Sequence, residues 1–177
     1  IQGGYGVTFA DLDNDGGRDV IGVSSGTPGP KVFAWHANGS RMDGWPVDIP
    51  PGALQNITGG LLSMDYLTHP AVGDIDGEPG LEVFVGHVDL FYPFHRLYAW
   101  HENGTLLTGW PITITGVVYN SPTLVDLTGD GRREIIVAGI YGYDGLENMS
   151  NYTTDPRETI YAYYANGTSV DGFGGDL

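Results

Sequence analysis

The amino-acid sequence predicts an all-β protein built from three four-stranded antiparallel units. The first observation is composition: the 177 residues include 29 glycines, and 12% are aromatic, a mixture typical of short strands joined by tight turns. The second is a pattern that occurs three times, with steps of 63 and 52 residues from Asp11 to Asp74 to Asp126. The third is an acidic loop at the same place in every copy.

The three copies align block by block. Each begins with an apolar run on both sides of the acidic loop: VTFADLDNDGGRDVIGV (7–23), PAVGDIDGEPGLEVFVG (70–86) and PTLVDLTGDGRREIIVAG (122–139). Each continues with aliphatic residues that alternate with aromatic ones: KVFAWHANGS (31–40), RLYAWHENGT (96–105) and TIYAYYANGT (159–168). Each closes on Gly-Trp-Pro or its counterpart: GWPV (44–47), GWPI (109–112) and DGFGG (171–175).

These blocks predict four strands in each copy. Two strands flank the acidic loop, because alternation of apolar residues resumes directly after it. The aromatic block supplies the third strand. The Asn-Gly pairs that begin at Asn38, Asn103 and Asn166 suit a type I′ turn, so we expect the fourth strand to return directly. The proline of Gly-Trp-Pro removes a backbone donor, which suits an edge strand or its exit.

The length of the repeat is typical of β-propeller blades. We therefore expect one propeller-type domain, or a fragment of one, with blade-like repeats at 1–51, 52–115 and 116–177. Two long connections are expected to be loops, at 52–69 and at 140–158. Closed propellers have about four to eight blades, so we expect further blades of the same chain, other copies of it, or another partner that caps the open sheet edges. Surface proteins and glycans are the other expected partners.

The acidic loops point to metal chemistry. Carboxylates at loop positions 1, 3, 5 and 9 can converge on one hard cation, and the backbone carbonyl at position 7 adds an oxygen. The expected ligands are Asp11, Asp13, Asp15, Gly17 and Asp19 in the first loop, Asp74, Asp76, Glu78, Gly80 and Glu82 in the second, and Asp126, Thr128, Asp130, Arg132 and Glu134 in the third. Calcium accepts six to eight oxygens in flexible geometry, so the sequence predicts up to three calcium ions.

Other interpretations of these loops are weaker. An EF-hand needs a glutamate at loop position 12, where this chain has Gly22, Val85 or Val137 inside strand-like alternation. Magnesium demands near-octahedral geometry, and the absence of Cys and His from the loops argues against zinc. Plain surface turns would not recur three times in register. We expect affinity to fall from the first loop to the third, because Pro79 alters the second turn and Thr128 replaces a carboxylate in the third.

The acidic motif, the strand after it, the Ala-Trp-x-x-Asn-Gly segment and Gly-Trp-Pro together resemble the FG-GAP/VCBS repeats of integrin-α-like propellers and microbial surface proteins. The resemblance covers nearly the whole chain. It implies four-stranded blades, calcium between the first two strands, and roles in adhesion or extracellular recognition. Thr128, Pro79 and the pair Phe173-Gly174, which stands in place of Trp-Pro, depart from the family pattern.

Charge and asparagine usage bear on location. The net charge of −15 disfavours nucleic acids and anionic membrane surfaces, and no apolar run is long enough to span a membrane. Six of the eight asparagines begin an N-x-S/T triplet, where chance gives about one. These expected glycosylation sites are Asn38, Asn56, Asn103, Asn148, Asn151 and Asn166. They indicate a secreted or cell-surface glycoprotein. Cysteine is absent, so redox compartment cannot be inferred.

The favoured function is therefore a calcium-binding structural or adhesion module of a cell surface, such as a filament or layer subunit. We expect no enzyme activity, because no nucleophile elbow, phosphate loop or zinc motif occurs. A carbohydrate-binding lectin or a polysaccharide-degrading propeller remains the alternative. His36 and His101 hold equivalent positions and are expected to be framework residues, as are the four recurrent tryptophans. His87 and His95 flank an aromatic segment that could contact a sugar or a metal.

Overall fold

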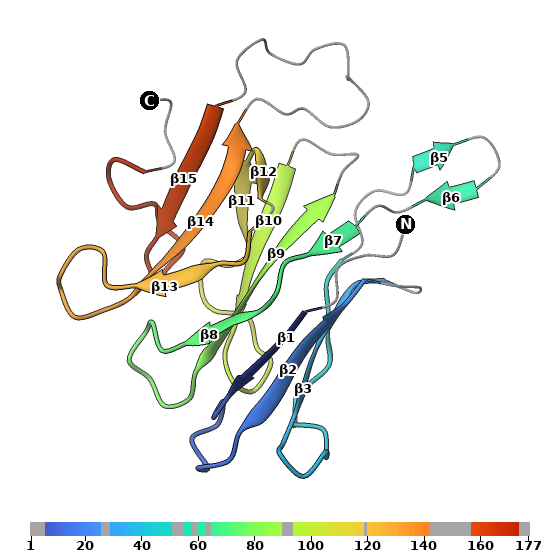
Figure 1. Ribbon diagram of the computed structural model, residues 1–177, viewed down its shortest axis with the longest axis vertical. Helices are drawn as coiled ribbons and strands as arrows, with labels where there is room; N and C mark the ends of the chain where they lie inside the picture. The colour runs from blue at the N-terminus through green and yellow to red at the C-terminus, as the bar shows by residue number, and fades with distance from the viewer. Residues whose placement is uncertain are drawn as a thin grey trace.

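The structure, a computed structural model, describes residues 6–25, 29–50, 55–57, 60–62, 65–89, 94–118, 120–141 and 157–173. Within these ranges the protein is all-β, with three antiparallel sheets that follow one another along the chain and a separate two-stranded hairpin (Figure 1). The described part of the chain contains no helix with the length and hydrophobicity needed to cross a bilayer. The prediction of an all-β fold is confirmed.

Each sheet arises from one sequence repeat. The first consists of β1 (Gly6–Ala10), β2 (Asp19–Ser24), β3 (Lys31–Trp35) and β4 (Val47–Asp48), in that order. The second consists of β7 (Asp65–Leu67), β8 (Ala71–Gly73), β9 (Glu82–Asp89), β10 (Phe94–Trp100) and β11 (Ile112–Thr115). The third consists of β12 (Val117–Val118), β13 (Thr123–Val125), β14 (Glu134–Tyr141) and β15 (Arg157–Tyr163). The hairpin is β5 (Gln55–Ile57) with β6 (Gly60–Leu62).

The first sheet has the expected four strands in sequence order, whereas the other two differ in detail. In the second sheet the first strand is divided, so that β7 and β8 both pair with β9. In the third sheet β12 and β13 both pair with β14, and the described residues include no fourth strand after β15. The sheets do not join into a closed barrel or propeller within the described ranges.

Both long connections differ from the loops that the sequence suggested. The segment 52–69 contains β5, β6 and β7, so it is not a simple loop. The ends of the insert at 140–158 belong to strands. β14 continues to Tyr141, β15 begins at Arg157, and Tyr141 pairs with Arg157. Residues 142–156 of the insert lie outside the described ranges.

The Asn-Gly turns are not of type I′, which needs positive φ at both central residues. Only the glycine is left-handed, with φ of 82° at Gly39, 78° at Gly104 and 78° at Gly167. The Gly39 N–H donates to the His36 carbonyl at 2.8 Å, and the His36 N–H donates to the Ser40 carbonyl at 2.9 Å. This pattern fits a longer turn that ends in a left-handed glycine. The return strand starts with a single bridge, Trp35 to Arg41, and β4 forms only after the cis Trp45-Pro46 bond.

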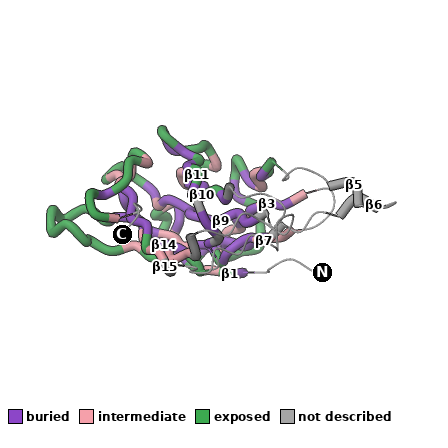
Figure 2. The backbone as a smooth tube through the Cα atoms, turned by 90° about the horizontal axis from the view of Figure 1, so that it is seen from above, coloured by how far each residue is buried: buried purple, intermediate pink, exposed green. Residues whose placement is uncertain are grey.

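The core forms between successive sheets, because each strand has apolar side chains on both faces. One cluster joins Ile21, Val32 and Trp45 of the first repeat to Val83 and Trp100 of the second. A second cluster joins the opposite face of the second sheet to the third. Its members include Ile75, Phe84, Leu97, Trp110, Ile135, Tyr161 and Tyr163. Strands β9 and β10 of the middle sheet are accordingly buried along most of their length, as Figure 2 shows.

Candidate metal sites in the acidic loops

The first acidic loop connects β1 to β2 at the lower end of the first sheet (Figure 1). The pairing of Ala10 with Asp19 closes its base. Carboxylates then organise the loop backbone. Asp13 Oδ1 accepts the Asp15 N–H at 3.2 Å, and Asp11 Oδ2 accepts the Gly16 N–H at 3.1 Å. Left-handed Asn14, with φ of 59°, lets the chain turn so tightly. The loop thus folds around its own acids.

Asp19 is the buried member of this group, with 1% of its surface exposed. Its Oδ2 accepts the Leu12 N–H at 2.8 Å, whereas its Oδ1 is buried with no hydrogen-bond partner. One carboxylate oxygen each from Asp11, Asp13 and Asp19 lies within 4.8 Å of the others. Three carboxylates at this separation repel one another, and a buried charge without a partner is costly. A divalent cation would remove both penalties.

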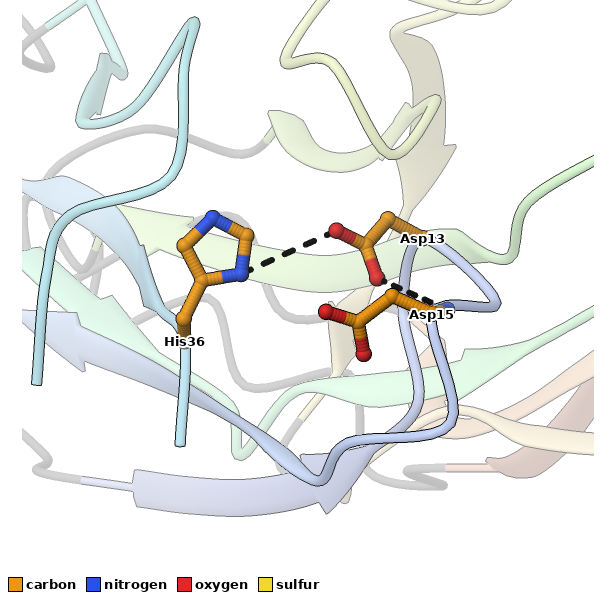
Figure 3. A group of neighbouring side chains, drawn as sticks. All are labelled: Asp13, Asp15 and His36. Carbon is orange, nitrogen blue, oxygen red and sulfur yellow. Dashed lines mark hydrogen bonds and ion pairs between the residues drawn. The ribbon is translucent and has the colours of Figure 1, made fainter. Parts of the chain in front are cut away.

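His36 approaches the same carboxylates from the turn after β3, a contact that we did not expect (Figure 3). Its Nδ1 lies 3.5 Å from Asp19 Oδ1 and 3.7 Å from Asp13 Oδ2. His36, Asp13 and Asp15 form a second group of possible ligands that shares Asp13 with the first. All four acids of the first loop therefore belong to the two groups, together with one imidazole.

The second acidic loop repeats this arrangement. Glu82, also 1% exposed, accepts the Ile75 N–H through Oε2 at 2.9 Å, and its Oε1 is buried with no hydrogen-bond partner. His101 is the counterpart of His36, with Nδ1 3.7 Å from Asp76 Oδ2 and 4.0 Å from Glu82 Oε1. Asp76, Glu82 and His101 form the group of possible ligands here. The same orphaned oxygen therefore recurs at the same loop position.

The environment of Glu82 acts strongly on its pKa. The pKa of Glu82 is raised from 4.5 to about 7, chiefly by burial; the charges of Asp76, Asp74 and Glu102 also raise it, and the hydrogen bond from Ile75 lowers it. A carboxyl group with a pKa near 7 is only partly ionised at neutral pH, and a positive neighbour would favour its charged form. A bound cation would supply that charge and release the proton.

The third loop differs from the first two in the hydrogen bonding of its last acid, Glu134. Both oxygens of Glu134 have partners: Oε2 accepts the N–H groups of Leu127 and Thr128 at 2.8 and 3.2 Å, and the Thr128 hydroxyl lies 3.4 Å from Oε1. Tyr164 occupies the place of His36 and His101. This loop is fully within the described residues, and no group of three possible metal ligands forms in it. Its carboxylates are satisfied by the protein itself.

The predicted ligands thus fall into two classes. The structure gathers Asp11, Asp13, Asp15 and Asp19 in the first loop, and Asp76 and Glu82 in the second. It does not place the remaining acids in a ligand group: Asp74, Glu78, Asp126, Asp130 and Glu134. The proposed carbonyl ligands at Gly17, Gly80 and Arg132, and the side chain of Thr128, stay predictions. Sequence reasoning missed His36 and His101, although their equivalent positions after Trp were visible.

Three of the expected glycosylation sites occupy the Asn-Gly turns. Asn38, Asn103 and Asn166 are exposed, and each Oδ1 accepts the N–H of the residue two positions on, at 2.8 to 3.0 Å. Asn56 lies in β5. Asn148 and Asn151 fall outside the described residues.

The other histidine pair is buried. His95 is almost fully buried in β10, with neither ring nitrogen hydrogen-bonded, and burial followed by the charge of nearby His87 lowers its pKa from 6.5 to about 4. His87, in β9, is buried as well and lies beside Tyr98. Neither ring is on an exposed surface. The aromatic segment between the two histidines, for which a sugar or metal contact is predicted, lies outside the described residues at 90–93, so that contact stays a prediction.

Comparisons with protein-family models, with curated proteins and with solved structures found no match. The geometry of the acidic loops is therefore the basis for the functional proposal.

Proposed function

We propose that the chain is a calcium-stabilised structural or adhesion module of an extracellular surface, built from propeller-type blades of the FG-GAP/VCBS kind. One observation carries the calcium proposal. The most buried acid of the first loop and the most buried acid of the second, Asp19 and Glu82, each hold one oxygen in the interior with no hydrogen-bond partner. Native proteins rarely leave such atoms unsatisfied, so a bound cation is the natural partner.

The chemistry of the donors favours calcium. The first loop offers four carboxylates, and calcium readily accepts such flexible oxygen sets. The histidines complicate this choice, because an imidazole beside carboxylates also suits zinc or manganese. His36 Nδ1 and His101 Nδ1 lie 3.5 to 4.0 Å from acid oxygens, which also suits a donor that orients the carboxylates. We assign them that supporting role.

The cation would be structural. Each acidic loop joins the first strand of its sheet to the central one, and the ligands span both ends of the loop, from Asp11 beside β1 to Asp19 in β2. A bound ion would hold these two strand ends together. The ion would also replace repulsion among the carboxylates by attraction. The module is then stable where calcium is at millimolar concentration, as it is outside cells.

The extracellular setting and the glycans belong to the same proposal. Their support is the set of six triplets, three of which present an exposed asparagine at equivalent turns. Tight turns on a surface are accessible to a glycosylating enzyme. The expectation that the chain is not an enzyme stays a prediction.

Calcium binding is tested directly by titration calorimetry on protein freed of metal, with calcium, manganese and zinc titrated separately. We expect at least two calcium ions per chain at millimolar calcium. His36→Gln should keep calcium binding within about tenfold, because calcium takes oxygen ligands. If the titration detects no heat of calcium binding up to millimolar calcium, the proposal is wrong. If His36→Gln abolishes metal binding, the sites belong to a metal that prefers nitrogen ligands and not to calcium.

A further inference from the structure

The contact between neighbouring repeats is built in the same way twice. Trp45 Nε1–H of the first repeat donates to the Glu102 carbonyl of the second at 2.7 Å. Trp110 Nε1–H of the second repeat donates to the Ala165 carbonyl of the third at 2.7 Å. In both cases the closing Gly-Trp-Pro segment of one repeat reaches the Asn-Gly turn of the next. The contact forms at equivalent positions of the repeat in both cases, and we call it the joint between repeats.

The glycine before each tryptophan makes the joint close. A Cβ on Gly44 would lie 1.9 Å from the Asn103 carbonyl oxygen, and one on Gly109 would lie 2.2 Å from that of Asn166. Both glycines have positive φ, 83° and 93°. Only glycine permits that backbone and that approach. Two backbone segments therefore pack directly on each other at each joint.

One half of this joint is free at each end of the described array. Gly172 has the same backbone form, with φ of 85°, and precedes Phe173 in the place of the tryptophan. Among the described residues, a Cβ on Gly172 would meet nothing within 4 Å, and neither would one on Gly39 of the first Asn-Gly turn. The third repeat thus presents the closing half, and the first repeat presents the turn half.

The third sheet also exposes a face that is buried in both preceding repeats. Val32 and Leu97 are fully buried, whereas Ile160 at the same position is 53% exposed. In the acidic loops Leu12 and Ile75 are at most 2% exposed, whereas Leu127 is 41% exposed. We call the surface around Ile160, Leu127 and Gly172 the tail face. Its side chains are those that cover the following sheet elsewhere in the molecule.

The first sheet exposes the opposite face. Phe9 is 63% exposed, whereas its counterparts Val72 and Leu124 are partly buried. Phe33 and Trp35 stack on this face with ring centroids 5.2 Å apart and are only half-buried. The equivalent pair in the second repeat, Tyr98 and Trp100, stacks at 5.3 Å and is buried against the first sheet. We call the surface around Phe9, Phe33 and Trp35 the head face.

We propose that the tail face of one copy of this chain docks on the head face of a second copy, through the joint that links its own repeats. Phe173 would take the place of Trp45 and Trp110 against the Asn38-Gly39 turn, with ring packing in place of the indole hydrogen bond. Ile160 and Leu127 would become buried against Phe9 and the Phe33–Trp35 stack. Of the large apolar side chains that are exposed in the described ranges, Phe9, Leu127 and Ile160 lie on these two faces, and Val7, two residues before Phe9 in β1, lies on the same side of its strand as Phe9. The inference does not depend on the cation.

Such an interface is heterologous, since two different surfaces meet. It yields a ring if the rotation closes and a filament if it does not. Glycans would not block it. Asn103 and Asn166 remain exposed although the backbone of their turns is packed against Gly44 and Gly109, so a glycan on Asn38 would point away from the joint in the same manner.

The test is the solution mass of the chain by analytical ultracentrifugation from micromolar to millimolar protein, in calcium. We expect assembly that rises with concentration. Phe9→Glu on the head face and Ile160→Glu on the tail face should each weaken assembly by about 30-fold or more, since each places a charge at the centre of an apolar contact. Both residues are exposed in the single chain, and circular dichroism checks that each variant folds. Leu106→Glu, exposed and outside both faces, is the matched control and should assemble normally.

Mixing the variants gives the decisive result. Phe9→Glu retains an intact tail face and Ile160→Glu retains an intact head face, so the mixture should form a 1:1 pair although each variant alone is monomeric. A wild-type chain that stays monomeric at millimolar concentration would overturn the proposal. So would assembly blocked by only one variant, which indicates a symmetric contact between like faces. If metal-free protein fails to bind calcium but still forms the mixed pair, the calcium proposal fails and this one stands.

Discussion

Replacing Asp19 by asparagine separates a cation site from an ordinary buried acid. Asparagine keeps an oxygen to accept the Leu12 N–H, so the local backbone contact survives. It removes the charge of a carboxylate that has one oxygen within 4.8 Å of oxygens of Asp11 and Asp13, and whose Oδ1 has no hydrogen-bond partner. Each such repulsion is worth about 1 kcal/mol in a water-like setting. Asp19→Asn should therefore stabilise the metal-free protein by about 2 kcal/mol.

Calcium should reduce this advantage. For a dissociation constant near 10⁻⁴ M and millimolar calcium, one site adds about 1.4 kcal/mol to stability. Two formed sites give the native chain about 3 kcal/mol, or roughly 6–12 °C in melting temperature at this size. Asp19→Asn retains only the second site, so its gain from calcium should be about half as large. The variant should melt above the native protein in chelator and should gain less from calcium.

The assay is calorimetric melting of both proteins in 1 mM EGTA and in 1 mM calcium, at concentrations where the chain is monomeric. Glu134→Gln is the matched control, because both oxygens of Glu134 already have protein partners. It should lose about 1 kcal/mol in both buffers and leave the calcium gain unchanged. If Asp19→Asn lowers the melting temperature equally with and without calcium, the orphaned oxygen has no cation partner and our reasoning is wrong.

Further predictions concern three other features. His95 has a pKa of about 4 in the folded state against an ordinary 6.5, so its folded state binds fewer protons than the unfolded state, and the free energy of unfolding should fall by about 3 kcal/mol as pH falls from 6.5 to 4. Chemical denaturation of the native protein and of His95→Leu at each pH checks this. An equal fall of the free energy of unfolding with pH in both proteins would contradict it. Gly44→Ala should cost about 1–3 kcal/mol more than Gly172→Ala in the monomer, since both have positive φ but only Gly44 meets a neighbouring carbonyl; equal melting shifts would exclude the close joint. In a secretory host, intact mass spectrometry should find glycans that disappear one at a time on Asn→Gln substitution at Asn38, Asn103 and Asn166, and an unmodified mass would argue against an extracellular glycoprotein.

The strands could be predicted from sequence because both faces of each sheet are apolar and the same unit occurs three times. The loop positions followed from the clusters of aspartate and glycine. The predictions that were wrong concern features that depend on pairing with other segments of the chain. The sequence predicts a loop at 52–69, whereas the segment contains β5, β6 and β7. The strand patterns in this segment are short. β7 forms because β9 extends far enough to pair with it, with Asp65 of β7 opposite Asp89 of β9. No local pattern reports the length of a partner strand.

The turn type failed for a related reason. Asn-Gly favours a type I′ turn in an isolated hairpin, yet Asn38, Asn103 and Asn166 do not have positive φ. Each asparagine instead accepts the N–H two residues on, and the following glycine packs against, or is free to pack against, another repeat. The turn serves the joint between repeats, which a single repeat cannot reveal.

The histidines, by contrast, were within reach of sequence reasoning once strand pairing is assumed. β2 and β3 pair with Val20 opposite Trp35, so the residue before Val20 and the residue after Trp35 lie opposite each other at the base of the acidic loop. These residues are Asp19 and His36. The same register sets Glu82 against His101 and Glu134 against Tyr164.

The pattern across the three repeats then becomes informative. Where a histidine faces the last acid of the loop, that acid keeps an orphaned oxygen, as in Asp19 and Glu82. Where tyrosine replaces histidine, Thr128 also replaces a carboxylate, and the oxygens of Glu134 are satisfied by the protein. Two independent positions change together, as expected if the third loop has lost its cation and the imidazole belongs with the ion. Restoring both, by Thr128→Asp with Tyr164→His, should add one calcium site by titration calorimetry; Thr128→Asp alone should give the same site with weaker affinity, and Tyr164→His alone should give none.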